Sequence, residues 1–167
     1  MSQEDNIDLN KQITLEEVRK TVFEMNPDKS PGPDGFQAFF FQKCWDIIGM
    51  DLWRAIEASR KGGSILTEIN HSFITLIPKK PDPEGPGDFR PIALCNTVYK
   101  NFSKILANRL KKILPKIISE EQTGFMPGRS ILDGIITIQE TIHSAGLNKE
   151  ECMLLKLDIQ KAYDMVD

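Results

Sequence analysis

Residues 153–167 read MLLKLDIQKAYDMVD, and the organisation of the rest of the chain is best understood from this stretch. The run before Asp158 is mostly apolar, which is typical of a short strand buried in a sheet. Asp158 would then lie at the strand tip, where a sheet opens to solvent or to a ligand. After it, apolar and aromatic residues, Tyr163 among them, recur at helical spacing. The stretch predicts a strand, an acidic turn and a helix; the alternative is that Asp158 only caps the helix.

Three further stretches precede this one. They are NPDKSPGPDGF at 26–36, ITLIPKKPDPEGPGDFRPIALCNTVYKNFSKILANRL at 74–110 and ISEEQTGFMPGRSILDGI at 118–135. Together the four resemble reverse transcriptases, in particular those of non-LTR (LINE-type) retrotransposons, with LKLDIQKAYDMVD as the first catalytic motif. The resemblance spans roughly residues 14–167. A single acidic motif would carry little weight, whereas four motifs in family order are specific.

The resemblance implies an α+β fold. A mostly helical fingers region with an antiparallel β-hairpin would be followed by the first strand of a reverse-transcriptase palm. Residues 13–150 are expected to form the fingers-like region, and residues 151–167 the truncated start of the palm. Residues 1–12 are polar and acidic, so a disordered tail is expected there.

Apolar residues at helical spacing predict a series of helices. These are expected at residues 14–25, 36–48, 51–60, 97–114, 116–121 and 130–144. Thr14 and Glu17 form a T-x-x-E capping pattern at the start of the first helix. A break is expected near Gly49, and the apolar aromatic run at 39–48 is expected to lie in the core. The isoleucines expected to face inward from the last helix are Ile131, Ile135, Ile138 and Ile142.

Two stretches rich in β-branched and aromatic residues, Ser72–Pro78 and Asp88–Cys95, predict a β-hairpin with a Pro- and Gly-rich tip. Lys79 and Lys80 on one arm and Arg90 on the other bring cations together. A triphosphate is strongly anionic, so such a hairpin can fold onto an incoming nucleotide. The resemblance implies nucleotide binding by Arg90, in the FRPIAL motif, and by Lys79 in preference to Lys80. The alternative is an ordinary surface hairpin with flanking cations.

A basic segment without acidic residues lies between Thr97 and Ile117. Its cations are Lys100, Lys104, Arg109, Lys111, Lys112 and Lys116. Such a helix face suits phosphate contact, and a solvated face is the alternative. The resemblance adds Lys29, in a loop associated with holding template nucleic acid. It also adds Arg129, in a Q-x-G-F-x-x-G-R-S signature, either as a template or backbone contact or as a salt bridge that positions its loop.

The resemblance implies an RNA template, a DNA primer and deoxynucleoside triphosphates as partners, with Mg²⁺ as cofactor. Templated polymerisation uses two divalent ions about 3.5–4 Å apart. Asp158 would be catalytic and a metal ligand, Ile159 would offer its carbonyl oxygen to the metal, and Tyr163 would pack under the sugar and favour deoxynucleotides.

The family's second motif, Tyr/Phe-x-Asp-Asp, does not occur in these 167 residues. One carboxylate cannot neutralise and space two Mg²⁺ ions. The isolated chain is therefore expected to be inactive in primer extension, and whether it is an enzyme by itself stays open.

Composition restricts the possible classes. The chain is 40% hydrophobic and 27% charged, as in globular proteins, and its net charge of -3 argues against a simple nucleic-acid coat protein. Cys44, Cys95 and Cys152 lack metal-ligand spacing and predict no disulfide framework. No apolar run approaches the roughly 20 residues that span a bilayer, and the N-terminus does not resemble a signal peptide. An intracellular protein, nuclear or cytoplasmic, without a membrane partner is expected; the oligomeric state is not indicated.

Two other functions compete with a partial reverse transcriptase. One is a non-catalytic remnant that binds nucleic acid, which a salt-dependent gel shift would detect. The other is an unrelated helical interaction domain. That interpretation gains if the hairpin and the strand at 153–158 are absent from the structure.

Overall fold

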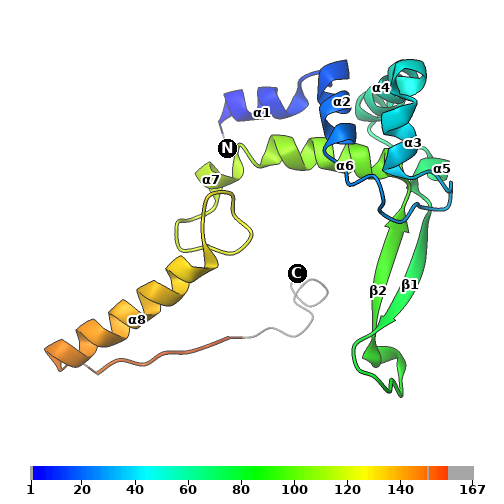
Figure 1. Cartoon of the computed structure of the whole chain (residues 1–167). Coiled ribbons are helices and arrows are strands. Elements are labelled where there is room, and N and C mark those ends of the chain that lie inside the picture. Colours follow the sequence, from blue (N-terminus) through cyan, green and yellow to red (C-terminus); the bar gives the residue numbers. More distant parts are fainter. Residues whose placement is uncertain (1, 150, 158–167) are drawn as a thin grey trace. The chain divides into compact units, whose positions relative to one another are not determined.

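Figure 1 shows the computed structural model of the chain, which describes residues 2–149 and 151–157. Its elements follow in the order α1 (Gln3–Asn10), α2 (Leu15–Phe23), α3 (Ala38–Lys43), α4 (Trp45–Gly62), α5 (Thr67–Asn70), β1 (Ser72–Pro78), η1 (Pro86–Asp88), β2 (Phe89–Cys95), α6 (Thr97–Leu110), α7 (Leu114–Ile117) and α8 (Ile131–Asn148). This is the predicted α+β class, with helices and one antiparallel sheet. The chain forms two compact units, Met1–Ile117 and Ile118–Asp167.

The first unit has a helical core in which α2 contacts α3, α4 and α6. Val18 and Val22 of α2 lie one turn apart, so both side chains point into this core, where neither is exposed to solvent. The other members of the buried cluster are Ile13, Phe41, Trp45, Leu52, Ile56 and Ile105. These residues come from segments that are far apart in sequence, so the core fixes the relative positions of α2, α3, α4 and α6.

The N-terminal segment differs from expectation. The sequence predicts a disordered tail over residues 1–12, but α1 occupies most of this range. Ser2 Oγ accepts a hydrogen bond from the Asp5 N–H (3.1 Å), and the Asp5 carboxylate accepts one from the Ser2 N–H (2.9 Å). Asp5 also pairs with Lys116 Nζ of α7 at 2.7 Å. A capped first turn and an ion pair therefore hold a helix that has little apolar surface.

The junction of α3 and α4 also differs from expectation. The predicted break near Gly49 lies instead at Cys44, between the two helices. Gly49 is buried inside α4, where an added Cβ would come within 2.8 Å of the Trp45 indole. The glycine permits close packing of the Trp45 ring rather than a break. The aromatic run is only partly core, because Phe41 is buried whereas Ile47 is 80% exposed.

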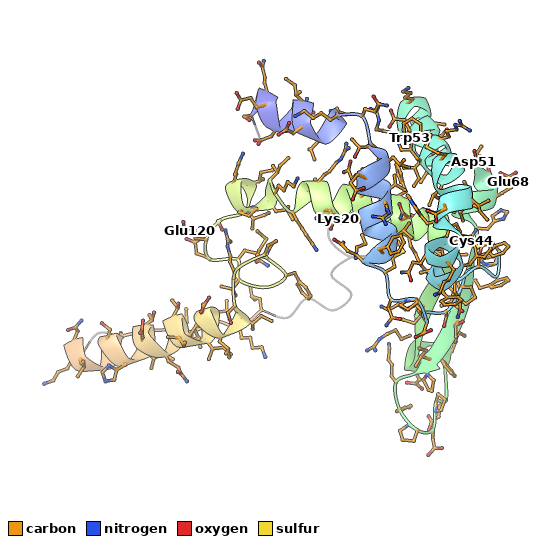
Figure 2. All side chains as sticks on the ribbon, turned by 45° about the horizontal axis from the view of Figure 1, so that its top comes forward. Lys20, Cys44, Asp51, Trp53, Glu68 and Glu120 are labelled. Atoms are coloured by element: carbon orange, nitrogen blue, oxygen red, sulfur yellow. The ribbon has the colours of Figure 1, made fainter. Side chains whose placement is uncertain are left out.

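The predicted hairpin is confirmed. Strands β1 and β2 pair antiparallel over their full length, from Ser72 opposite Cys95 to Pro78 opposite Phe89. Every β1 residue is exposed, and no residue of β2 is buried. Figures 1 and 2 show the ribbon extending away from the helices of its unit, with Glu68 of α5 labelled beside its root. The orientation of the ribbon is therefore set at its root rather than by packing on either face.

Helix α6 ends at Leu110, earlier than the predicted limit of residue 114, and α7 begins at Leu114. The reason is Pro115. Its ring excludes a helical hydrogen bond to the Lys111 carbonyl, so one helix cannot run through this point. Pro115 lies instead in the first turn of α7, where its missing N–H is not needed.

The second unit contains α8, which begins with a capping box between Ser130 and Asp133. It extends past the predicted end at residue 144. Its isoleucines expected to face inward are 44–65% exposed, and no residue of α8 is buried. The predicted strand from residue 153 is absent over the described residues Met153–Leu157, which are exposed. A strand needs a partner for its backbone N–H and C=O groups, and the described sheet contains only β1 and β2.

Candidate nucleic-acid interface

Residues 26–37, in the segment between α2 and α3, are here called the proline-glycine loop. It folds through a turn in which the Gly35 N–H donates to the Gly32 carbonyl at 3.0 Å. Gly35 adopts φ +74°, a conformation that favours glycine. Gly32 lies against the backbone and side chain of Asn96, where any Cβ would collide.

Three side chains at the start of α6 hold this loop. Asn96 Oδ1 accepts from the Asp34 N–H at 3.1 Å. Thr97 Oγ1 donates to the Phe36 carbonyl at 2.7 Å, and Lys100 Nζ donates to the Ser30 carbonyl at 3.0 Å. The loop is thus fixed against the end of α6 that adjoins the hairpin.

Three of the predicted nucleic-acid-binding residues meet beside this loop. Lys29, from the loop, and Lys100 and Lys104, from α6, line one pocket of about 310 Å³, here called the lysine pocket. The rest of its lining is Glu24, Met25, Asn26, Ala38 and Thr97. Glu24 is the only acid among these residues, and its carboxylate lies 3.5 Å from Lys104 Nζ. The pocket keeps an excess of positive charge and suits an anionic ligand.

The hairpin carries the cations predicted to bind a nucleotide. Arg90 lies opposite Ile77 and is exposed, and among the described residues its guanidinium makes no hydrogen bond or ion pair. Lys79 Nζ donates to the Gly87 carbonyl at 2.9 Å, and Lys80 Nζ lies 3.1 Å from the Asp88 carboxylate. The predicted preference for Lys79 over Lys80 stays a prediction, since both amines contact the tip.

Asp88 organises the hairpin tip. Its carboxylate accepts the N–H groups of Glu84 (2.9 Å) and Gly85 (3.2 Å). The Glu84 N–H, followed by the Lys80 ammonium, holds the pKa of Asp88 below its ordinary value. An ionised Asp88 therefore fixes the loop that joins the two strands.

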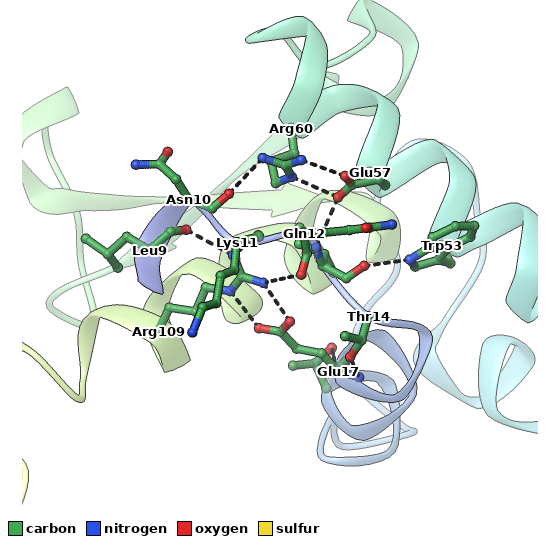
Figure 3. A network of polar contacts seen from close by, with 12 residues as sticks. Leu9, Asn10, Lys11, Gln12, Thr14, Glu17, Trp53, Glu57, Arg60 and Arg109 are labelled. Carbon is green, nitrogen blue, oxygen red and sulfur yellow. Dashed lines mark hydrogen bonds and ion pairs between the residues drawn. The ribbon is translucent and has the colours of Figure 1, made fainter. Parts of the chain in front are cut away.

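Arg109, predicted to bind nucleic acid, lies in a different environment (Figure 3). Its guanidinium donates to both oxygens of the Glu17 carboxylate, at 2.8 and 2.7 Å. It also donates to the carbonyls of Leu9, Lys11 and Gln12. These five bonds use all five N–H donors of an arginine. The Arg109 hydrogen bonds lower the pKa of Glu17. In this structure Arg109 binds the protein itself.

The same network holds the rest of residues 9–13, here called the connector. Arg60 donates to the Asn10 carbonyl at 3.0 Å, and Trp53 Nε1 donates to the Ile13 carbonyl at 2.7 Å. Glu57 accepts the Ile13 N–H at 3.1 Å. Every connector carbonyl therefore accepts a side-chain hydrogen bond, and the connector joins α4 to α6 (Figure 3).

The remaining cations predicted for this basic segment differ in their partners. Lys116 is paired with Asp5, whose hydrogen bond raises the pKa of the Lys116 ammonium. Lys111 and Lys112 are exposed and make no ion pair with the described residues. Of the predicted positions on α6, only Lys100 and Lys104 lie in the lysine pocket.

Arg129, in the second unit, holds its own loop. Its guanidinium donates to the carbonyls of Gln122 (2.9 Å) and Ile118 (3.1 Å), and also to that of Ser119. The sequence left open a nucleic-acid contact or a salt bridge that positions the loop. In the structure Arg129 positions this loop through backbone carbonyls rather than through a salt bridge, and its contact with a nucleic acid stays a prediction.

The predicted catalytic and metal-binding positions, Asp158 and Ile159, lie outside the described residues, as does Tyr163. The expected placement of Asp158 at a strand tip beneath the hairpin stays a prediction. Among the residues that are described, no group of three or more His, Cys, Asp or Glu side chains could hold a metal ion. No helix in that part of the chain has the length and apolar character needed to cross a membrane.

Asn96 is a site residue that sequence reasoning missed. It follows β2 and is the N-cap residue of α6, whereas the sequence predicted only that a helix begins at Thr97. An asparagine between a strand and a helix is itself a signal, because asparagine is among the preferred N-cap residues. The partners of its side chain lie in the proline-glycine loop and in α5, 27 to 62 positions earlier in the chain, so the residues next to Asn96 do not indicate them.

Comparison with known proteins agrees with the motifs. The family model "Reverse transcriptase (RNA-dependent DNA polymerase)" matches residues 77–167. The chain is 36% identical over 155 residues to a transposon TX1 uncharacterized 149 kDa protein of Xenopus laevis, which covers 93% of this chain and 12% of that protein. It is 34% identical over 91 residues to a probable RNA-directed DNA polymerase from transposon BS of Drosophila melanogaster, covering 53% of this chain and 10% of that protein.

A third relative, from the same fly, is the retrovirus-related Pol polyprotein from type-2 retrotransposable element R2DM. It is 24% identical over 152 residues, covering 91% of this chain and 14% of that protein. The chain thus spans roughly a tenth of the length of these curated relatives. The hairpin and these matches favour the polymerase interpretation over a helical interaction domain. In agreement with its resemblance to non-LTR retrotransposon enzymes, this chain belongs to the reverse transcriptase (RNA-dependent DNA polymerase) family.

Proposed function

We propose that this chain supplies the fingers part of a polymerase that copies an RNA template into DNA. In this proposal the lysine pocket and the proline-glycine loop hold the phosphate backbone of the template. The β1–β2 hairpin meets the triphosphate of the incoming deoxynucleotide, and residues 151–167 begin the palm.

The observation that carries the proposal is the convergence of Lys29, Lys100 and Lys104 on one pocket. Lysine ammonium groups bind phosphate as point charges and need no fixed orientation. The pocket lies beside a loop whose backbone is already anchored by Asn96 and Thr97. A preorganised cationic surface of this kind loses less entropy on binding a nucleic-acid strand.

The hairpin contributes a second anionic subsite in this proposal. Arg90 is exposed, and its guanidinium makes no hydrogen bond to the residues that the structure describes. Its planar set of five N–H donors therefore suits a bidentate phosphate contact. Lys79 follows Pro78, the last paired residue of β1, and adds a second positive charge. Its backbone N–H donates to the Asp88 carbonyl at 2.7 Å.

Polymerases of this family imply a divalent metal, and Asp158 and the Ile159 carbonyl are the residues proposed to hold Mg²⁺. Carboxylate and carbonyl oxygens are donor types that Mg²⁺ prefers. When bound, the metal would neutralise charge that develops on the transferring phosphoryl group. Tyr163 is proposed to pack under the deoxyribose, where its ring would exclude a 2′-hydroxyl.

The proposal is tested by binding a single-stranded RNA across a range of salt concentrations. Replacing Lys29, Lys100 and Lys104 with alanine should weaken binding. Because each phosphate contact to a single strand contributes about 0.7 to the slope of log affinity against log salt, the slope should fall by about 2. The matched control replaces three exposed lysines outside the pocket, Lys20, Lys43 and Lys61, which changes the net charge equally. Equal slopes for the two triple variants would contradict the proposal.

A further inference from the structure

We propose that Asn96 is a positioning residue that couples the proline-glycine loop to the root of the hairpin. Through this coupling, nucleic acid held at the loop would set the orientation from which the hairpin meets a nucleotide. The inference rests on the proposed function. It states how the template site at the lysine pocket is connected to the nucleotide site on the hairpin.

Asn96 is 3% exposed, and its side-chain amide joins two segments. Its Oδ1 accepts the Asp34 N–H of the proline-glycine loop at 3.1 Å. Its Nδ2 donates to the carbonyls of Glu68 and Ile69 in α5, at 3.1 and 3.2 Å. Because α5 ends two residues before β1, one buried side chain bonds the loop on one side and the start of the hairpin on the other.

The side chain of Asn96 is not used for the local task that its position favours. Asn96 is the N-cap residue of α6, yet its side chain makes no capping hydrogen bond. Asparagine at an N-cap ordinarily satisfies an N–H of the first helical turn. A buried polar side chain that serves distant backbone groups instead indicates that the distant connection matters.

Gly32 brings the loop into direct contact with this residue. A Cβ at Gly32 would collide with the backbone N and Oδ1 of Asn96 and with the carbonyl carbon of Cys95. Cys95 is the last residue of β2, so the loop lies against the second strand of the hairpin where that strand ends. A displacement of the loop must therefore move both Asn96 and the end of β2.

The hairpin has few other constraints on its direction. Every residue of β1 is exposed and no residue of β2 is buried, so helix packing does not orient the ribbon. Strand β1 follows α5 and strand β2 ends just before Asn96, and the Asn96 side chain donates to the Glu68 carbonyl of α5. Asn96 therefore joins both ends of the ribbon at the root.

The test measures amide hydrogen exchange in the full chain, with and without a single-stranded RNA. In the parent chain, RNA should slow exchange in the proline-glycine loop and at the hairpin root, residues 68–75. In Asn96→Ala, RNA should still slow exchange in the loop, but the effect at the root should be lost. Asn96→Asp keeps an acceptor for Asp34 and removes the donor to α5, so it should lose the root effect in the same way.

The matched control is Asn101→Ala on the same helix. Asn101 is fully buried and its Nδ2 donates to the Val18 carbonyl at 3.4 Å, so this change should lower stability. A positioning role predicts that Asn101→Ala retains the RNA effect at the hairpin root, whereas a merely structural role predicts that both asparagine variants behave alike. Retention of the root effect in Asn96→Ala would overturn the inference.

A measurement without RNA separates this inference from the proposed function. Gly32→Ala changes only the loop side of the contact. It should nevertheless speed exchange at residues 68–75 by about tenfold, the factor expected for loss of about one hydrogen bond. If the parent chain binds no RNA but Gly32→Ala has this effect, the proposed function fails and the coupling stands. If Gly32→Ala leaves the root unchanged, the coupling is wrong whether or not RNA binds.

Discussion

Arg109 is the residue on which the attachment of the N-terminal segment most depends. Its guanidinium satisfies three connector carbonyls and the Glu17 carboxylate. We expect Arg109→Lys to lower the free energy of unfolding by about 2–3 kcal/mol, because one ammonium cannot replace five donors in a planar fork and partly buried acceptors lose their partners. Urea denaturation measures the change.

The control for Arg109→Lys is Lys111→Ala, two residues further on and exposed. It should change stability by less than about 0.5 kcal/mol, as is usual at surface positions. Equal stability of Arg109→Lys and the parent would show that the connector does not depend on this network.

Glu57 predicts a specific acid dependence. The hydrogen bond from Arg60, with a further one from the Ile13 N–H, lowers the Glu57 pKa from 4.5 to about 2, despite the opposing effect of desolvation. Since the folded-state pKa lies below the unfolded value, the stabilisation is complete above pH 4.5 and is lost as the pH falls toward 2. Glu57→Gln should therefore be less stable than the parent at pH 6, and the difference should shrink across this window. Thermal unfolding from pH 6 to pH 2 tests this, and a constant difference would contradict it.

Single residues were predictable from sequence as chemical types, but not as parts of a shared site. Lys29 and Lys100 were each predicted as phosphate contacts, and the structure brings them into one pocket. Arg109 has the same local setting as its basic neighbours, yet its partners lie about ninety to a hundred positions earlier in the chain. Because those partners are mostly backbone carbonyls, no residue type marks them in the sequence.

At the scale of elements, α4 shows why a glycine in a helix need not break it. Gly49→Ala should be destabilising even though alanine favours helices, since its Cβ would come within 2.8 Å of the buried Trp45 ring. Gly62→Ala, in the last turn of the same helix, meets nothing within 4 Å and should stabilise by up to about 1 kcal/mol. Thermal melts of both variants measure the contrast, and changes of the same sign would contradict the packing explanation.

The hairpin is an element with apolar side chains on both exposed faces. A two-stranded ribbon with open edges can pair with other chains, and a lysine on such a strand opposes that pairing. Ile74, 69% exposed in β1, is the position to change. Ile74→Lys should reduce concentration-dependent self-association in light scattering without lowering the melting temperature of the helical core.

Ile47→Lys provides the control, because Ile47 is 80% exposed but lies in the helix α4. A helix has no open edge of backbone groups with which another chain could pair. It adds the same charge and should reduce self-association less. If both variants reduce it equally, net charge rather than the ribbon edge explains the effect.

Elements were more predictable than their boundaries. The hairpin was predictable because β-branched runs on either side of a Pro- and Gly-rich loop leave few alternatives. The predicted strand is absent at residues 153–157. An apolar run indicates a segment that could be buried as a strand, but it does not supply the neighbouring strand with which that segment must pair. The α3–α4 junction lies at Cys44, and helical periodicity does not report where one helix ends and the next begins.

At the scale of the whole molecule, the buried cluster lies entirely within the first unit, between Ile13 and Ile105. A chain ending at Ile117 should therefore melt within about 3 °C of the full chain, since burial of apolar surface is the main source of stability. A chain ending at Leu110 loses buried Ile113 and the pairing of Lys116 with Asp5, and should melt at least about 5 °C lower. Circular dichroism distinguishes these outcomes, and an unfolded chain ending at Ile117 would contradict the description.

Photocrosslinking tests the proposed function most directly. A single-stranded RNA containing 4-thiouridine would be bound to the full chain, irradiated, and the attached peptides identified by mass spectrometry. Cross-links should fall in the proline-glycine loop, residues 26–37, and in the first two turns of α6, which contribute the three lysines of the lysine pocket. Cross-links confined to other surfaces, or their persistence at the same sites after Lys29, Lys100 and Lys104 are replaced, would contradict the proposal that this face holds the template.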